Sequence, residues 1–257
     1  MSTVYRVMRD VQSRFGFALQ AKANLQRTMR KLRSVPFESE FRLLSAIEPG
    51  NRCMLDIGAN RGQSIDAIRM YQPDAVLHAF EPNGLLYRQL ETKFPKDQSL
   101  VLHKMGLGAE PMEAPLYVPF YRNFMYDGLA SFSKSEAESW LNEDTVWNFS
   151  PELVKTKQEH CSIGVLDTLS LKPCFVKIDV QGFEKQVLEG GAKTISTSEP
   201  VILIELNVEA DKWLLDRGWS RYGFFDGKLV HNIHGDNNTV YLKRSNAEHQ
   251  KLIAEFS

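Results

Sequence analysis

The stretch CMLDIGANRGQS, residues 53–64, decides the fold. A short apolar run leads into a turn that contains Gly58 and Gly62, and apolar residues then recur at helical spacing. A strand, a glycine turn and a helix in this order are typical of the nucleotide-binding unit of an open α/β sheet. The two glycines are not spaced as in GxGxxG, so the turn alone leaves open which nucleotide it binds.

The same order of strand and helix recurs along the chain. Apolar runs predict strands at residues 53–58, 75–82, 99–108, 175–179, 201–207, 221–225 and 239–244. Helical spacing predicts helices at residues 37–47, 62–71, 84–94, 183–195 and 209–218. This alternation indicates an α/β fold with a mainly parallel sheet.

The domain prediction has three parts. We expect an N-terminal basic helical extension at residues 1–48 and one main domain at residues 49–257. Within the main domain, residues 109–171 break the alternation and are rich in aromatic side chains. Long interruptions of this kind are usually functional, so we expect an insertion that builds a substrate pocket.

The first 34 residues are strongly basic, although the whole chain has a formal net charge of -1. Their apolar residues recur at helical spacing, which predicts an amphipathic helix. Such a helix would lie on an anionic membrane or an acidic partner, or its apolar stripe would pack on the domain with its charges solvated. We favour packing over membrane contact. The charged residues are Arg6, Arg9, Arg14, Lys22, Arg27, Arg30, Lys31 and Arg33, against the single acid Asp10.

Composition predicts a cytoplasmic protein that does not bind nucleic acid. The near-zero net charge gives no argument for a nucleic-acid partner. The charged N-terminus does not resemble a secretory signal, and no apolar run approaches the ~18 residues of a membrane span. Three cysteines without paired spacing favour a reducing compartment.

Two acidic residues indicate the kind of nucleoside. Asp56 precedes the glycine turn, where it would oppose the diphosphate of a dinucleotide. The ammonium group of S-adenosylmethionine suits that position better. Glu81 ends the second predicted strand, where a carboxylate accepts hydrogen bonds from ribose hydroxyls. Each acid alone has a structural explanation, a helix cap or a solvated strand end, but together they predict a nucleoside site.

A second polar group lies in VKIDVQGFEKQ, residues 176–186. Asp179 ends the fourth strand and Lys177 shares its face, and charges inside an apolar strand are costly unless they are paired or functional. We therefore expect either an active-site acid or a buried pair that joins strand to helix. Glu205 and Asn207 end the next strand and would border the same cleft.

The chain resembles the FkbM-type methyltransferases of the class I S-adenosylmethionine-dependent superfamily. The matching segments are DIGANRGQS (56–64), FEPN (80–83), MGLG (105–108), LDTL (166–169), VKIDVQGFEKQVLEGGAKTI (176–195) and PVILIELN (200–207). The resemblance implies a Rossmann-like, seven-stranded, mainly parallel sheet with its last strand antiparallel and helices on both faces. It also implies O-methylation of a hydroxyl on a sugar, a glycan precursor or another small molecule.

The resemblance also assigns a cofactor site. The glycine turn with the preceding acid would hold the methionine end of S-adenosylmethionine, Glu81 the ribose, and MGLG would line the adenine pocket. The acid often found near the adenine in the wider superfamily is missing here. The residues assigned to the cofactor are Asp56, Gly58, Asn60, Gly62, Glu81, Pro82 and Gly106.

For the reaction, we predict that Asp179 orients or deprotonates the acceptor hydroxyl with Glu205 as helper. His103 and His160 are alternative bases. The two acids would alternatively share a divalent metal, but the sequence has no compact ligand cluster, so we predict none.

Three further questions stay open at this level. The insertion's aromatic residues would stack on a sugar or form a small core of their own. A nicotinamide-dependent oxidoreductase and a non-catalytic binding module are alternative functions on a related sheet. The sequence does not predict an oligomeric state. The aromatic residues are Tyr117, Tyr121, Phe124, Tyr126 and Trp140.

Overall fold

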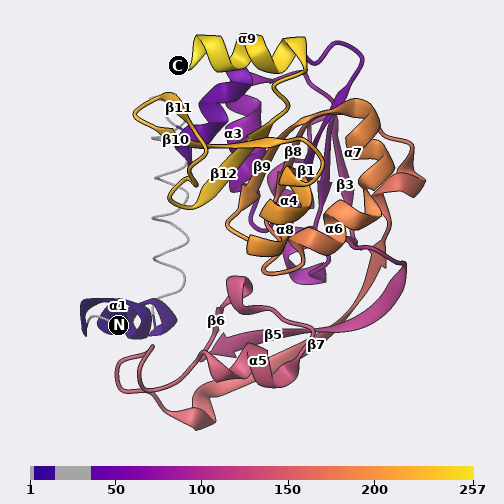
Figure 1. Cartoon of the computed structure of the whole chain (residues 1–257). Coiled ribbons are helices and arrows are strands. Elements are labelled where there is room, and N and C mark those ends of the chain that lie inside the picture. The colour runs from indigo at the N-terminus through magenta and orange to yellow at the C-terminus, as the bar shows by residue number, and fades with distance from the viewer. Residues whose placement is uncertain (1–2, 15–35) are drawn as a thin grey trace. The chain divides into compact units, whose positions relative to one another are not determined.

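The computed structural model describes residues 3–14 and 36–257, which fall into two compact units (Figure 1). The smaller unit combines residues 1–33 with residues 113–161, and the larger unit combines residues 34–112 with residues 162–257. The boundary differs from the predicted one at residue 48. Residues 34–48 belong to the larger unit because η1 (Ser39–Ala46) buries its apolar side chains in that unit's core.

The larger unit is built on one sheet in the order β11-β10-β12-β9-β8-β1-β2-β3. The five neighbouring strands β9, β8, β1, β2 and β3 pair in parallel, and β12 runs antiparallel to β9. The predicted antiparallel last strand is therefore correct. The strands are β1 (Cys53–Ile57), β2 (Leu77–Phe80), β3 (Leu100–His103), β8 (Pro173–Ile178), β9 (Val201–Glu205), β10 (Ser220–Phe225), β11 (Lys228–His231) and β12 (Asn238–Leu242).

The sheet has eight strands, so the prediction of seven is wrong by one. The additional strand is β11, which pairs antiparallel with β10 through a hairpin. Its turn consists of Asp226 and Gly227, both with positive φ, at 50° and 81°. An Asp-Gly pair between two strands is a strong hairpin signal because both turn positions require positive φ.

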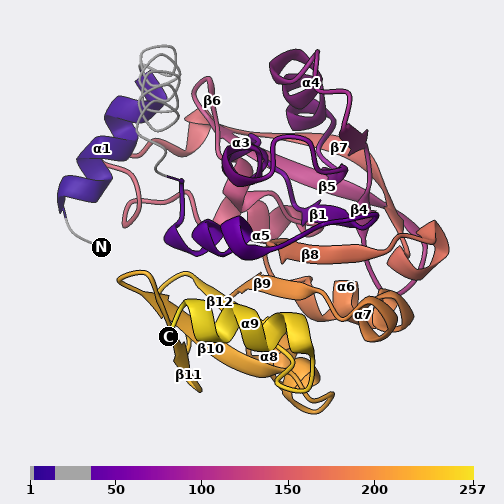
Figure 2. The ribbon, with the colours of Figure 1, turned by 90° about the horizontal axis from the view of Figure 1, so that it is seen from above.

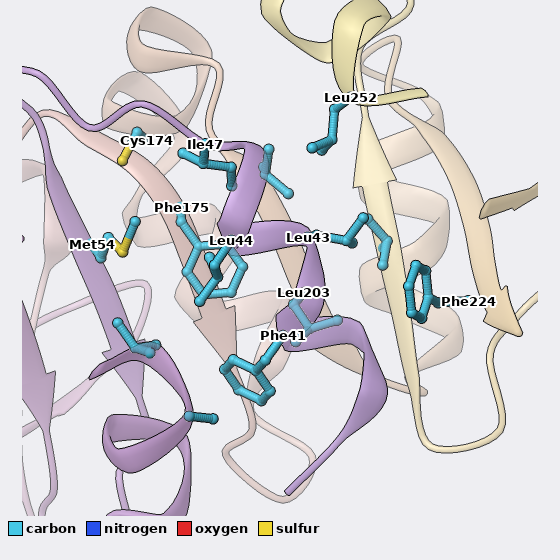
Figure 3. Close-up of a cluster of buried hydrophobic side chains, with 14 of the residues drawn as sticks. Phe41, Leu43, Leu44, Ile47, Met54, Cys174, Phe175, Leu203, Phe224 and Leu252 are labelled. Carbon is cyan, nitrogen blue, oxygen red and sulfur yellow. The ribbon is translucent and has the colours of Figure 1, made fainter. Parts of the chain in front are cut away.

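Helices cover both faces of this sheet (Figure 2). One face packs against η1, α3 (Gln63–Tyr71), α4 (Gly84–Lys93) and α9 (Ala247–Glu255). The other packs against α6 (Glu184–Gly190), α7 (Ala192–Ser198) and α8 (Val208–Leu215). Figure 3 shows Phe41, Leu43 and Leu44 of η1 clustered with side chains of the strands. Burial on both faces explains why the parallel strands are continuously apolar.

The single helix predicted at residues 183–195 is two helices, α6 and α7. They meet at Gly190 and Gly191, where a side chain has no room. A Cβ on Gly190 would lie 1.9 Å from the carbonyl oxygen of Gly108. The chain therefore passes close to residues 106–108 at this point, and the glycines permit both the break and the contact.

A second sheet has the order β4-β7-β5-β6. Its strands are β4 (Gly106–Leu107), β5 (Met112–Tyr121), β6 (Phe124–Met125) and β7 (Val154–Gly164). In the smaller unit, α5 (Lys134–Ser139) accompanies them, and Tyr121, Tyr126, Leu141 and Val146 form a buried core. Tyr121 and Tyr126 thus pack inside the unit, and Phe124 packs against them.

The N-terminal helix α1 (Thr3–Arg14) belongs to the smaller unit. It buries Asp10 and Ser13, whereas Val7, Met8 and Val11 are exposed. The prediction that its apolar stripe packs on the domain is therefore wrong for the described residues. None of the helices within residues 3–14 and 36–257 is both long and apolar enough to cross a membrane.

Candidate active site

The turn after β1 is held in shape by two glycines. Gly58 has φ of 87°, and a Cβ there would lie 1.9 Å from the carbonyl oxygen of Asp179. Gly62 has φ of 72°, and a Cβ there would press on Leu90 and Phe94 of the α4 region. Both positions require glycine for conformation and for space. The turn is thereby packed directly against the end of β8 on one side and α4 on the other.

The backbone N–H groups of this turn are already used within the protein. Residues 58, 59, 60 and 62 each donate a hydrogen bond to a neighbouring acceptor. A diphosphate site needs such groups free to point at the ligand. The acceptors are Phe80 O for Gly58 and Ala59 (3.0 Å each), Glu81 Oε2 for Asn60 (2.8 Å) and Ala59 O for Gly62 (2.7 Å).

Glu81 follows β2 and joins the two neighbouring turns. Its Oε2 accepts from the Asn60 amide and its Oε1 accepts from the Asn83 amide, both at 2.8 Å. Asn83 caps α4 by accepting from Leu85 N at 2.9 Å. In the described part of the chain, Asn60 Oδ1 and Asn83 Nδ2 are buried without a hydrogen-bond partner. One acceptor and one donor beside Glu81 are therefore unsatisfied by the protein, which fits a polar ligand at this place.

Asp56 lies beneath the turn and has no exposed surface. Its Oδ2 accepts from the Ser64 hydroxyl at 2.5 Å, and its Oδ1 lies 3.9 Å from Lys177 Nζ. Burial raises the pKa of Asp56, and Lys177 opposes that rise. Among the described residues, Asp56 Oδ1 is buried without a hydrogen-bond partner. Asp56 therefore supports the turn through Ser64, and its direct contact with the methionine end of a cofactor stays a prediction.

Lys177 and Asp179 form an ion pair at the end of β8. Lys177 Nζ donates to Asp179 Oδ2 at 3.0 Å, closer than its 3.9 Å approach to Asp56. The lysine is buried, whereas 34% of the Asp179 side chain is exposed. Burial alone would raise the pKa of Asp179. The charge and hydrogen bond of Lys177 outweigh burial, so the pKa of Asp179 lies below its ordinary value. Asp179 is therefore held ionised by an ammonium behind it and faces solvent.

Glu205 ends β9 and meets Asp179 through Gln181. Gln181 Nε2 donates to Asp179 Oδ1 at 3.1 Å and to Glu205 Oε2 at 3.0 Å, and the two carboxyl groups also share a hydrogen bond. Burial, followed by the charges of Asp179 and Glu184, raises the pKa of Glu205 to about 7, against the opposing charge of Lys177. Such a carboxyl group exchanges a proton near neutral pH, which suits a general base.

Glu184 and Asn207 hold the loop that carries Gln181. Glu184 Oε1 accepts from the amides of Val180 and Gly182, both at 3.1 Å. Its Oε2 accepts from Asn207 Nδ2 at 2.7 Å, and Asn207 in turn caps α8. Asn207, predicted with Glu205 to border the cleft, therefore supports through Glu184 the loop that follows β8 and carries Asp179 and Gln181.

Sequence analysis missed two residues of this site. Lys93 of α4 donates to the carbonyl oxygens of Arg61 and Gly62, at 2.6 and 3.0 Å, and so holds the turn after β1. Glu38 precedes η1, and its charge acts on Lys177 and Asp179. Burial raises the pKa of Glu38, and Lys177 opposes the rise. Neither residue belongs to a recognisable motif, so only the packing of α4 and η1 identifies them.

The other predicted site residues separate into two groups. Gly106 lies beside Pro82, since a Cβ on Gly106 would be 3.6 Å from Pro82 Cβ, so these two predicted cofactor-binding residues are neighbours. His103 instead hydrogen-bonds His78 at 2.9 Å, and burial lowers the pKa of both rings. His160 is exposed on β7 in the smaller unit.

No group of three or more histidine, cysteine, aspartate or glutamate side chains is placed to hold a metal ion among the residues that the structure describes. Asp179 and Glu205 are bridged by an amide group. The contacts that the structure gives these two acids are therefore hydrogen bonds and the ion pair with Lys177.

A mainly parallel sheet with helices on both faces and polar groups gathered at its strand ends is the architecture of nucleotide- and nucleoside-binding α/β proteins. The family model for the methyltransferase FkbM domain matches residues 56–236. The chain therefore belongs to the FkbM methyltransferase family, as its sequence motifs predict. This membership supports a methyltransferase and gives no support to the oxidoreductase hypothesis.

Comparison with solved structures finds two methyltransferases of low similarity to this chain. The methyltransferase FkbM from Methylobacillus flagellatus KT is 14% identical with a TM-score of 0.46, and the match covers 74% of this chain and 43% of that one. The precorrin-6y C5,15-methyltransferase from Geobacter metallireducens GS-15 is 17% identical with a TM-score of 0.40, covering 79% and 83%. This chain thus spans less than half of the first protein. No curated protein matches the sequence. The family match carries the assignment.

Proposed function

We propose that this protein transfers a methyl group from S-adenosylmethionine to a hydroxyl group on a sugar, a glycan precursor or another small molecule. The observation that carries the proposal is the pair of carboxyl groups, Asp179 and Glu205, joined by Gln181 at the ends of β8 and β9. The pair lies next to the glycine turn, because Gly58 packs against the Asp179 carbonyl.

The turn after β1 suits a cofactor without phosphates. Four of its amide groups already donate within the protein, which leaves them unavailable to a diphosphate. The carbonyl groups of the turn and the unpartnered Asn60 Oδ1 are acceptors, and these match an ammonium group. When bound, S-adenosylmethionine would supply a methyl group already activated by its sulfonium.

The remaining polar groups match the nucleoside half of that cofactor. The Glu81 carboxylate accepts the backbone amides of Asn60 and Asn83, and a carboxylate oxygen can accept more than one hydrogen bond, so Glu81 would also accept a ribose hydroxyl. Asn83 Nδ2 is a buried donor in need of an acceptor. Pro82 and Gly106, side by side, offer an apolar surface for the adenine. Asp56 serves as a positioning residue beneath the turn.

Asp179 and Glu205 would have different roles toward the acceptor hydroxyl. Lys177 keeps Asp179 ionised, so Asp179 would orient the hydroxyl by accepting its hydrogen bond. Glu205, with its pKa near 7, would take the proton as the new bond forms. The sequence predicts that Asp179 orients or deprotonates the hydroxyl with Glu205 as helper. The raised pKa of Glu205 supports giving the proton-accepting role to Glu205 and the orienting role to Asp179. Alignment of the two reactants would contribute the rest, since well-placed groups react as if at roughly 10⁵–10⁸ M.

Apolar side chains beside the pair indicate the character of the acceptor. Leu206 and Val208, on either side of Asn207, expose 54% and 80% of their surface. An acceptor with an apolar portion next to its hydroxyl would cover them and remove that surface from water. Alkyl glycosides and lipid-linked sugars are therefore the first acceptors to test.

A methyl-transfer assay tests the proposal. Wild-type protein is incubated with isotopically labelled S-adenosylmethionine and a panel of free sugars, alkyl glycosides and hydroxylated lipids, with mass-spectrometric detection. We expect labelled ether products that disappear in Glu205→Gln. Binding of S-adenosylmethionine without transfer to any hydroxyl would favour a non-catalytic binding module, and binding of NAD in its place would refute the cofactor assignment.

A further inference from the structure

Helix α1 is held to the smaller unit by its polar side. Trp147 N donates to the Arg6 carbonyl at 3.1 Å, and Arg9 Nη1 donates to the Thr145 carbonyl at 3.4 Å. Asp10 is 7% exposed and pairs with Arg14 at 3.0 Å. Figures 1 and 2 show α1 beside the chain between α5 and β7. The contacts of α1 with its unit are therefore made by polar side chains and backbone groups. An ordinary surface helix instead packs its apolar face against the core.

The apolar side of α1 is turned outward. Val7, Met8 and Val11 are 40%, 57% and 47% exposed, and their spacing places them on one face. Trp140 and Trp147, also exposed, lie under the guanidinium groups of Arg9 and Arg6 at 4.3 and 5.4 Å. We call the set of three apolar side chains with the two Arg–Trp pairs the α1 surface.

The α1 surface has the chemistry of a membrane-binding helix. Helices that lie in the membrane interface combine an apolar face with arginine and tryptophan at its edges. Residues 1–34 carry eight basic side chains against one acid, in a chain whose net charge is -1. This local excess of positive charge is complementary to anionic phospholipid headgroups.

A second copy of the chain is a poorer occupant. The three exposed side chains offer roughly 250 Å² of apolar surface, well below the ~800 Å² that each partner contributes to a stable interface. A membrane needs no matching protein surface, and a few apolar side chains suffice when basic residues assist them.

We propose that α1 docks this protein on the surface of anionic phospholipid membranes, with Val7, Met8 and Val11 inserted among the headgroups. The excess positive charge of residues 1–34 attracts lipid phosphates, while the Arg6–Trp147 and Arg9–Trp140 pairs keep the helix attached to its own unit. Attachment of this kind depends on both charge and apolar insertion, so it weakens when either is removed.

Co-sedimentation of the full-length protein with vesicles tests this inference. One vesicle contains equal parts of phosphatidylglycerol and phosphatidylcholine, and the other contains phosphatidylcholine alone. We expect binding to the first, little binding to the second, and release as salt concentration rises. The double variant Val7→Asp/Val11→Asp should lower the partition coefficient at least about tenfold, since it removes insertion and adds negative charge.

The matched control is Val230→Asp in β11, the same change at a side chain that is 40% exposed and belongs to the other unit. It should bind vesicles as the wild type does. Circular dichroism verifies that each variant is folded. Absence of wild-type binding to anionic vesicles, or equal binding by the double variant, would overturn the inference. A wild-type dimer that the double variant abolishes, without vesicle binding, would assign the surface to a second copy instead.

Discussion

The two halves of the site differ in how their polar groups are satisfied. Beside the turn after β1, the Glu81 carboxylate accepts the backbone amides of Asn60 and Asn83. At the ends of β8 and β9, carboxyl groups face one another instead, and an exposed amide group, that of Gln181, joins them. In the first half, the Glu81 carboxylate fixes the backbone conformation. In the second half, two carboxyl groups lie close enough to shift the pKa of Glu205.

This difference indicates separate duties for the two halves. A carboxylate that accepts backbone amides stays ionised and rigid, which suits a binding surface. A carboxyl group beside another carboxylate has a raised pKa, which suits proton transfer. Substitutions in the first half should therefore affect cofactor affinity, and those in the second should affect turnover.

Gly58→Ala should disrupt both halves, because Gly58 is the point where they touch. The added Cβ would overlap the Asp179 carbonyl at 1.9 Å, and the residue must keep φ of 87°. We expect a loss of about 3 kcal/mol in the free energy of unfolding and loss of both cofactor binding and turnover. Urea unfolding and calorimetry measure these changes.

The matched control is Gly218→Ala, which has φ of 84° but no atom within 4 Å of the added Cβ. It isolates the cost of positive φ, about 1–2 kcal/mol, and should leave methyl transfer intact. Equal effects of the two substitutions would show that the contact between the halves has no special role.

Glu205→Gln should lower kcat about 10²–10⁴-fold, because it removes the proposed proton acceptor while keeping the side chain's shape. Cofactor affinity should stay within a few-fold of the wild type, since Glu205 lies outside the turn after β1. Steady-state kinetics with an acceptor from the panel measures the change. Full activity in this variant would return the base role to Asp179 or to solvent.

The pH dependence of turnover should follow Glu205. Its pKa of about 7 predicts that kcat/KM falls about tenfold for each pH unit below neutrality, with a single acidic limb. The limb should be missing from the residual activity of Glu205→Gln. A pH-independent wild-type rate between about pH 5 and 8 would contradict the assignment.

The raised pKa of Glu205 also predicts that the free energy of unfolding falls as pH rises, whereas turnover rises. The folded-state pKa of Glu205 lies above its ordinary value of 4.5, so the folded protein binds this proton more tightly than the unfolded chain. Its contribution to stability is therefore present at low pH and is lost as pH rises from 4.5 to about 7. Urea unfolding across this range should show a shallower decline for Glu205→Gln.

Glu81→Gln should have a smaller effect on function than Gly58→Ala or Glu205→Gln. The amide keeps one acceptor oxygen but places an NH₂ group against a backbone N–H, which leaves one buried donor unpaired. We expect S-adenosylmethionine to bind about tenfold more weakly with little change in kcat. Calorimetric titration measures the affinity, and a change in kcat alone would break the division between the halves.

Local sequence patterns predicted the parts of the fold that depend on backbone chemistry. Continuous apolar runs identified the parallel strands, and Gly58 and Gly62 marked the turn where both conformation and space demand glycine. The Asp226-Gly227 turn is an equally strong local signal, and β11 follows it in a stretch between residues 225 and 239 where the apolar pattern predicts no strand. The exposure of Val7, Met8 and Val11 in α1 was not predictable from the sequence, because an amphipathic pattern does not determine which face of the helix packs against the protein.

The site was predictable as a set of residues but not as a set of roles. Asp56, Glu81, Asp179 and Glu205 all stand at strand ends, as their motifs indicate. Their duties depend on neighbours that come from distant parts of the chain. Lys177 Nζ lies 3.0 Å from Asp179 Oδ2 but 3.9 Å from Asp56 Oδ1, so its main ion pair is with Asp179. Only the folded structure shows which of the two acids Lys177 pairs with.

The most direct test of the divided site is to measure S-adenosylmethionine affinity and kcat together in Asp179→Asn. This substitution keeps the side chain's size and leaves its backbone contact with Gly58 in place. Our account predicts a dissociation constant within about threefold of the wild type and a kcat at least about 10²-fold lower. Loss of cofactor binding with kcat preserved at saturation would contradict it.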